Sequence, residues 1–169
     1  MLELAIRQSL EPLELASLTI DHIGSTAVPG LDAKDVIDIQ IGVTDDQALD
    51  AVALTLAESG FSLTSFTEDH PIPRWSPEPS QWKKRLVQQQ PDGRAANIHI
   101  RVIDRDNYRF ALAFRDYLRA NPDRAADYLN QKRRLAAEHH DTLGYSMAKD
   151  SVIDQVAGQI PSELCNEDL

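Results

Sequence analysis

Two short apolar stretches on either side of a glycine-containing break constrain the fold of this chain more than any other feature. Residues 18–23 mix β-branched and polar side chains, as a half-buried strand does, and Gly24-Ser25-Thr26 then interrupts the pattern. Residues 36–43 form a second apolar run. The sequence therefore predicts a strand, a polar loop and a second strand, around which the other elements are organised.

Two polar residues, Asp38 and Gln40, interrupt the second predicted strand. Because they are two positions apart, they share one face of a strand, while isoleucines at the alternate positions occupy the other face. A carboxylate and an amide in an otherwise apolar strand need a partner, which can be a metal ion, a hydrogen-bond network or a ligand. We therefore expect this face to carry the chemistry of the protein or a buried polar network.

A later pair of strands is predicted at 83–90 and 97–102, because apolar and polar residues alternate there on either side of a turn. On the second of them, Asn97, His99 and Arg101 share one face, and apolar residues share the other. This is the same division into a polar and an apolar face as at Asp38 and Gln40.

Most of the remaining chain has helical patterns, and no repeat or linker divides it. We expect an α/β (α+β) fold, in which a mixed sheet of about five strands is packed with helices, as one domain over residues 1–169. The tail from about 161 is expected to fray. The predicted helices are 1–17 with an end or kink at Pro12, 45–59, 106–120, 122–140 and a last helix capped by Ser146.

Residues 67–82 are expected to lack regular structure, because their four prolines exclude a helix or a central strand. The segment also carries Trp75 and Trp82. Two interpretations remain open: a lid over a site, or a packed surface excursion whose tryptophans fill a groove.

The charge of the chain limits its partners. Its formal net charge is -10, so repulsion from phosphate backbones excludes non-specific nucleic-acid binding. A small anionic ligand remains compatible, because cationic side chains concentrate between residues 83 and 119. This concentration indicates either a local basic pocket for a phosphate group or a solvated basic surface.

The composition also indicates where the protein acts. No apolar run has the length of a membrane span, and the first residues lack the basic start and apolar centre of a signal peptide. Cys165 is the single cysteine, so an internal disulfide is excluded. We therefore expect a cytoplasmic protein with no membrane partner.

A series of short motifs follows in order along the chain. The first and longest is His-Ile-Gly-Ser-Thr-Ala-Val-Pro-Gly-Leu at 22–31. The later ones are Ala33-Lys34, Ile37-Asp38-Ile39, Ile98-His99-Ile100, Phe114-Arg115-Asp116-Tyr117-Leu118-Arg119, Tyr128, Lys132 and Leu135-Ala136. Together they resemble the GrpB family, also called UPF0157, which has a nucleotidyltransferase-like fold.

The resemblance implies a phosphate- and metal-binding site at the two-strand motif. Nucleotidyltransferases hold a triphosphate on a Gly-Ser pair, and carboxylates on neighbouring strands hold divalent metals. Gly24-Ser25 matches the pair and Asp38 matches the first acid, but Gln40 stands where a second acid is expected. His99 stands where a third acid could be expected, as a metal ligand or general base.

These correspondences give the candidate site. Asp38 and His99 are the catalytic candidates, and together with Gln40 they are the candidate metal ligands. One carboxylate, one amide and one imidazole form a weak site for magnesium or manganese, and zinc is a less expected occupant. The residues assigned to substrate binding are His22, Gly24, Ser25, Thr26, Lys34, Arg101, Arg115 and Lys132.

Three functions remain open. The leading one is binding of a nucleotide or another phosphorylated small molecule, with metal-dependent nucleotidyl transfer as its enzymatic form. The second is a non-catalytic ligand-sensing or accessory domain, which Gln40 favours. GrpB-like sequences occur fused to dephospho-CoA kinase, so such a domain would be related to coenzyme A. The third is a metal-dependent hydrolase that uses Asp38, His99 and His22. A structural role remains the alternative for each residue taken alone.

Overall fold

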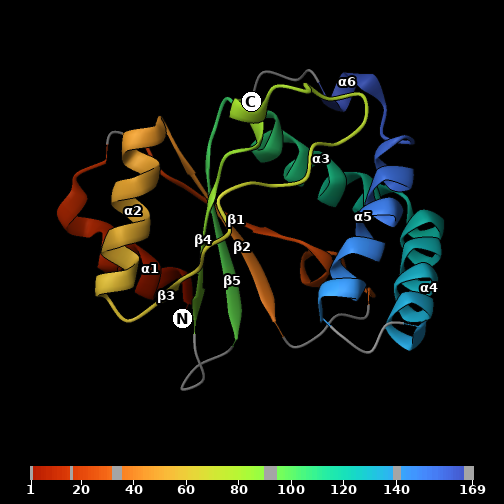
Figure 1. Ribbon diagram of the computed structural model, residues 1–169, viewed down its shortest axis with the longest axis horizontal. Coiled ribbons are helices and arrows are strands. Elements are labelled where there is room, and N and C mark those ends of the chain that lie inside the picture. Colours follow the sequence, from red (N-terminus) through yellow and green to blue (C-terminus); the bar gives the residue numbers. More distant parts are fainter. Residues whose placement is uncertain (1, 16, 32–35, 90–94, 139–141, 166–169) are drawn as a thin grey trace.

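Within the part of the chain that the structure describes, five strands form one mixed sheet (Figure 1). The computed structural model describes residues 2–15, 17–31, 36–89, 95–138 and 142–165. β2 and β5 pair in parallel, whereas the other neighbouring strands are antiparallel. The strands, in the spatial order β1-β2-β5-β4-β3, are β1 (Thr19–Ile23), β2 (Ile37–Val43), β5 (Ala96–Val102), β4 (Arg85–Gln89) and β3 (Ser62–Leu63). The predicted mixed sheet is confirmed.

Helices lie on both sides of this sheet (Figure 1). On one side are α1 (Leu2–Leu10) and α2 (Asp46–Glu58), and on the other are α3 (Asp106–Ala120), α4 (Pro122–Glu138), α5 (Thr142–Ala157) and α6 (Ser162–Cys165). No helix in the described ranges is long and apolar enough to cross a membrane.

One predicted helix boundary was wrong. The last long helix begins at Thr142 rather than at Ser146, so it contains Gly144 in its first turn. A glycine inside a helix costs only about 1 kcal/mol relative to alanine, which packing can offset. The expected fraying from 161 onward stays a prediction; within that segment, residues Ser162–Cys165 form the short helix α6. Residues 166–169 lie outside the described part of the chain.

The main hydrophobic core lies between the sheet and the pair α1 and α2. Asp45 fixes the start of α2, because its Oδ1 accepts a hydrogen bond from the backbone N–H of Ala48 at 2.8 Å. The apolar face of the sheet and one face of each helix supply the buried residues. They are Ile6, Leu10, Ile39, Ile41, Val43, Leu49, Val52, Ala53, Leu56, Val87, Ile98, Ile100 and Val102.

A second core joins the helices on the other side of the sheet. It includes Val28 and Leu31 from the loop after β1, so this core fixes the loop as well as the helices. The N-terminal end of α3 reaches the sheet at Gly42, where a Cβ atom would lie 2.6 Å from Cε2 of Tyr108 and 2.4 Å from Oγ1 of Thr19. The absence of a side chain at Gly42 therefore permits the close approach of α3 to β2.

The proline-rich segment packs against the rest of the molecule, as the second of its two interpretations proposed. Trp82 is 1% exposed and its Nε1–H donates a hydrogen bond to the carbonyl oxygen of Ser76 at 2.7 Å. Ile72 and Trp82 pack against Ala157 of α5. The backbone N–H of Ser76 donates to Asp106 at 2.8 Å. The segment thus connects the sheet to α3 and α5.

We expect Gly42→Ala to lower the free energy of unfolding by about 1–3 kcal/mol, the usual cost of overpacking, because the new methyl group would collide with Tyr108 and Thr19. Gly158→Ala is the matched control, since the nearest atoms lie 3.5 Å from its Cβ position. Urea unfolding of both variants measures the difference. Equal stabilities of the two variants would contradict the close packing at Gly42.

Candidate functional site

The strand register brings the predicted polar residues onto one face of the sheet. Gln40 lies opposite His99 across the parallel pair β2 and β5, and Asp38 lies opposite Asn97. Arg101 is two positions beyond His99 and shares its face. We call this surface of β2 and β5 the polar face. It unites four of the candidate residues: Asp38, Gln40, His99 and Arg101.

Other candidates lie elsewhere. His22 is aligned with Ile39, so it is on the apolar side of β1, where its Nε2 lies 2.8 Å from Oγ1 of Thr26. This position removes His22 from the ligand set of the hydrolase hypothesis. Lys34 lies outside the residues that the structure describes.

The Asp38 carboxylate is covered from two directions. Its Oδ1 accepts a hydrogen bond from Nδ2 of Asn97 at 3.0 Å, and Asn97 in turn accepts one from Gln88 at 2.9 Å. A Cβ atom on Gly24 would lie 2.4 Å from Oδ2 of Asp38, and Gly24 has a φ of +68°. The loop between β1 and β2 therefore rests directly on the carboxylate, and only glycine permits both the backbone conformation and the contact.

The hydrogen bond from Arg101 defines the tautomer of His99. Because a guanidinium group can only donate, the contact of 3.4 Å from Nη2 of Arg101 to Nδ1 of His99 places the imidazole lone pair on Nδ1. The proton of the neutral ring is then on Nε2, which faces Oδ1 of Asp38 at 3.9 Å. The N–H group of the neutral His99 ring, with its partial positive charge, therefore points toward the Asp38 carboxylate.

Burial and charge set the ionisation of this pair. Burial lowers the pKa of His99 from 6.5 to about 4; Asp38 opposes this shift, and the positive charges of Arg101 and Lys84 reinforce it. Burial alone would raise the pKa of Asp38, but interactions with His99 and Asn97 outweigh it and hold that pKa below 3.8. At neutral pH the face therefore carries a carboxylate beside a neutral imidazole.

Both ends of the Gln40 amide are occupied by protein groups. Its Oε1 accepts a hydrogen bond from Nη1 of Arg101 at 2.5 Å, and its Nε2 donates to the carbonyl oxygen of Tyr108 at 3.3 Å. The side chain is fully buried. Gln40 therefore fixes the position of Arg101 and of the start of α3.

Asp69 completes this network, and the sequence interpretation missed it. Its carboxylate accepts hydrogen bonds from Nε of Arg101 at 2.8 Å, from Nζ of Lys84 at 2.6 Å and from Nδ2 of Asn107 at 3.2 Å. Burial acts to raise the pKa of Asp69, but the two cations prevail and hold it far below its usual range. The signal in the sequence was indirect: Lys84 and Arg101 occupy inward strand positions, where a buried cation needs an anion.

The loop after β1 is held by cationic side chains of α3 and α4. Nζ of Lys132 donates to Oγ of Ser25 at 2.8 Å and lies 5.6 Å from the ring centre of Tyr128. Nε of Arg119 donates to the carbonyl oxygen of Ala27 at 2.8 Å, and Nη1 of Arg115 donates to that of His22 at 3.2 Å. Of the predicted substrate-binding cations, Lys132 therefore reaches the loop, and Arg115 reaches the end of β1 just before it.

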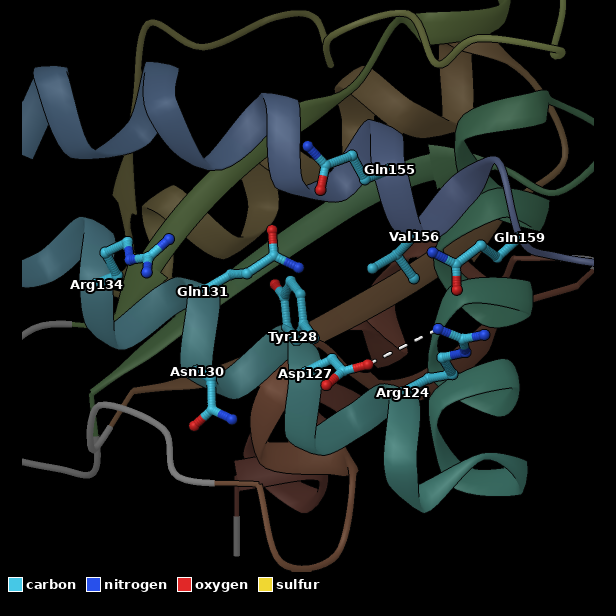
Figure 2. Close-up of a pocket in the computed structure, with 9 residues that line it drawn as sticks. All are labelled: Arg124, Asp127, Tyr128, Asn130, Gln131, Arg134, Gln155, Val156 and Gln159. Carbon is cyan, nitrogen blue, oxygen red and sulfur yellow. Dashed lines mark ion pairs between the residues drawn. The ribbon is translucent and has the colours of Figure 1, made fainter.

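A separate groove of about 340 Å³ lies between α4 and α5, and Figure 2 shows polar side chains of both helices around it. It contains an ion pair between Arg124 and Asp127 at 3.7 Å. None of the residues assigned to the candidate site lines it, although Tyr128 of the family motifs does. The lining residues are Arg124, Asp127, Tyr128, Asn130, Gln131, Arg134, Gln155, Val156 and Gln159.

The predicted metal ligands do not fit a divalent ion in this arrangement. The Gln40 oxygen is bound by a guanidinium group, and the His99 lone pair faces Arg101 rather than Asp38. In the described ranges, no group of three histidine, cysteine, aspartate or glutamate side chains is placed to hold a metal ion. Binding a metal through these three residues would require Arg101 to leave the polar face.

Comparison with known proteins identifies the family. A profile described as GrpB protein matches residues 2–159. The chain belongs to the GrpB family. The crystal structure of conserved protein GrpB from Enterococcus faecalis superposes with a TM-score of 0.71 and 26% identity, over 95% of this chain and 88% of that one.

Sequence relatives carry two kinds of name. A UPF0157 protein of Pseudomonas aeruginosa is 32% identical over 87% of this chain and 57% of its own length. A protein of Mycolicibacterium paratuberculosis named dephospho-CoA kinase is 42% identical over 69% of this chain. This chain spans about a third of that relative, 32% of its length.

The stability of the protein is expected to fall as the pH is lowered from about 6.5 to about 4, because the unfolded chain binds a proton at His99 that the folded protein binds only at lower pH. The difference between the two pKa values of His99 lowers the free energy of unfolding by at most about 3 kcal/mol over this range. Melting temperatures of wild type and His99→Gln across this range measure it. The variant should show a smaller decrease, and identical profiles would contradict the assignment.

A second expectation concerns the contact between the loop and the carboxylate. Gly24→Ala and Gly30→Ala share the cost of a positive φ, about 1 kcal/mol, since φ is +68° and +77°. Only Gly24→Ala adds a collision with Asp38, because nothing lies within 4 Å of the Cβ position of Gly30. Urea unfolding should show an additional loss of about 1–3 kcal/mol for Gly24→Ala. Equal losses would place Asp38 away from the loop.

Proposed function

We propose that this protein binds a nucleotide or another phosphorylated small molecule beside Ser25, in the loop after β1. The observation that carries the proposal is the ammonium group of Lys132 on the hydroxyl of Ser25, in the loop that resembles a nucleotidyltransferase phosphate loop. Ammonium and hydroxyl donors are the groups that proteins use to hold phosphate oxygens.

The distribution of charge supports an anionic ligand. Arg119 of α3 binds a carbonyl oxygen of the same loop, Arg115 of α3 binds the carbonyl oxygen of His22 near the end of β1, and Lys149 of α5 is close enough to lower the pKa of Asp38. These cations gather in one region of a chain whose net charge is -10. Asp116 offsets part of this charge, because it pairs with Arg115 at 2.7 Å and with Arg119 at 3.5 Å, and the remaining positive charge would attract a small anion. The proposal keeps the cytoplasmic location expected from the sequence.

The state of Gln40 favours binding without nucleotidyl transfer. A second carboxylate on β2 is absent, and the amide that replaces it is fully engaged by Arg101 and Tyr108. The protein would then act as a ligand-sensing or accessory domain. Nucleotidyl transfer is the second candidate, which the Gly-Ser loop and Asp38 favour.

The relatives suggest which ligands to test first. The protein of M. paratuberculosis is named dephospho-CoA kinase, and this chain matches about a third of it. Dephospho-CoA, coenzyme A and ATP therefore form the first group of probes, and the other nucleoside triphosphates form the second.

A thermal-shift screen tests the proposal. A ligand at 100 times its dissociation constant stabilises the folded state by about 2.7 kcal/mol, which raises the melting temperature by several degrees. We expect at least one of these compounds to do so for wild type, and Lys132→Met to weaken its binding by about tenfold, or 1.4 kcal/mol.

Lys83→Met is the matched control for this screen, because Lys83 is an exposed lysine that pairs at 3.9 Å with Asp46, away from the loop. It should bind the ligand as wild type does. Absence of a shift with every compound would refute the proposed function, and equal binding by Lys132→Met and wild type would move the site away from Ser25.

A further inference from the structure

Three of the polar atoms at the predicted metal site, Oδ1 of Asp38, Oε1 of Gln40 and Nδ1 of His99, are already held by protein partners that a metal ion would have to displace. Oδ1 of Asp38 accepts the hydrogen bond from Asn97, and its Oδ2 packs against Gly24. The oxygen of Gln40 and the lone pair of His99 are both directed at Arg101. A hard divalent cation needs several oxygen ligands in open geometry, and this face does not offer them.

The polar face also contains fixed positive charge. Arg101 and Lys84 are both buried, and they share one direct carboxylate partner, Asp69. Asp69 and Asp38 are both ionised, so these two carboxylates balance the two cations and the polar face is close to neutral. A divalent cation would add two further positive charges to a face whose charges are already balanced.

The geometry of Arg101 explains how this charge is held in place. Its guanidinium group contacts three side chains at once: Gln40 at 2.5 Å, Asp69 at 2.8 Å and His99 at 3.4 Å. A planar guanidinium with several donors suits such a multiple contact, and a hydrated metal ion would require all three partners to rearrange.

We infer that Arg101 is a built-in cation that takes the place of a divalent metal at the polar face, so that the phosphorylated ligand binds beside Ser25 without a metal ion. This inference rests on the proposed function for the identity of the ligand. Its statement about metal exclusion rests only on the contacts of Arg101, Gln40, His99 and Asp38, and can be tested without any ligand.

The first experiment compares ligand affinity with and without metal. Calorimetric titration of wild type with ATP and with dephospho-CoA is carried out in EDTA and then in magnesium or manganese. We expect dissociation constants that agree within about twofold. An affinity that falls about tenfold or more in EDTA would overturn the inference.

The second experiment uses manganese alone, followed by its electron paramagnetic resonance signal. Wild type and Gln40→Glu should show no manganese binding that depends on Asp38, because a new carboxylate at position 40 would pair with Arg101. The double variant Gln40→Glu with Arg101→Gln places two carboxylates on β2 without that guanidinium, and it should bind manganese. Adding Asp38→Asn to wild type and to each variant shows which manganese binding takes place at the polar face, because only that binding should be lost.

The outcomes separate the two proposals. Manganese binding by wild type that is lost in Asp38→Asn overturns the inference, even if no ligand is found. Absence of ligand binding in both EDTA and metal refutes the proposed function but leaves the manganese result decisive. A folded double variant that binds no manganese would show that Arg101 is not what excludes the metal. If the double variant does not fold, wild type and Gln40→Glu decide the question.

Discussion

The ion cluster of Asp69 with Arg101 and Lys84 is the interaction on which the rest of the structure depends. It joins the proline-rich segment to β5 and to the start of β4, and Asn107 adds α3 to the same carboxylate. Removal of one partner from such a buried cluster leaves an uncompensated charge, at a typical cost of about 3–5 kcal/mol. The cluster therefore adds a buried ionic contact to elements that also pack through Ile72, Trp82 and the residues around them.

The same cluster determines the chemistry of the polar face. Arg101 orients the amide of Gln40 and fixes the tautomer of His99, and His99 in turn directs its N–H edge at Asp38. A chain of contacts thus runs from Asp69 through Arg101, His99 and Asp38 to Gly24, in the loop that carries Ser25. Gln40 has a defined structural role in this series of contacts, because its side-chain oxygen accepts a hydrogen bond from the guanidinium group of Arg101.

The sequence predicted those parts of the site that depend on local periodicity. Asp38 and Gln40 were expected on one face, as were Asn97, His99 and Arg101, because alternation along a strand is a local property. His22 was selected for its place in a motif, although alternation along β1 aligns it with Ile39 on the other face. Asp69 could not be found in this way, since its segment has no period and its partners are 15 and 32 residues away.

The parallel pairing of β2 with β5 has a consequence for folding. The hydrogen bond between Asp38 and Asn97 joins residues that are 59 positions apart, and α2, β3 and β4 lie between them along the chain. Contacts of such large sequence separation form slowly, because the entropy of closing the intervening loop must be overcome first. The polar face therefore needs the chain from β1 to β5, and a short fragment containing the Gly-Ser loop lacks the residues that complete it.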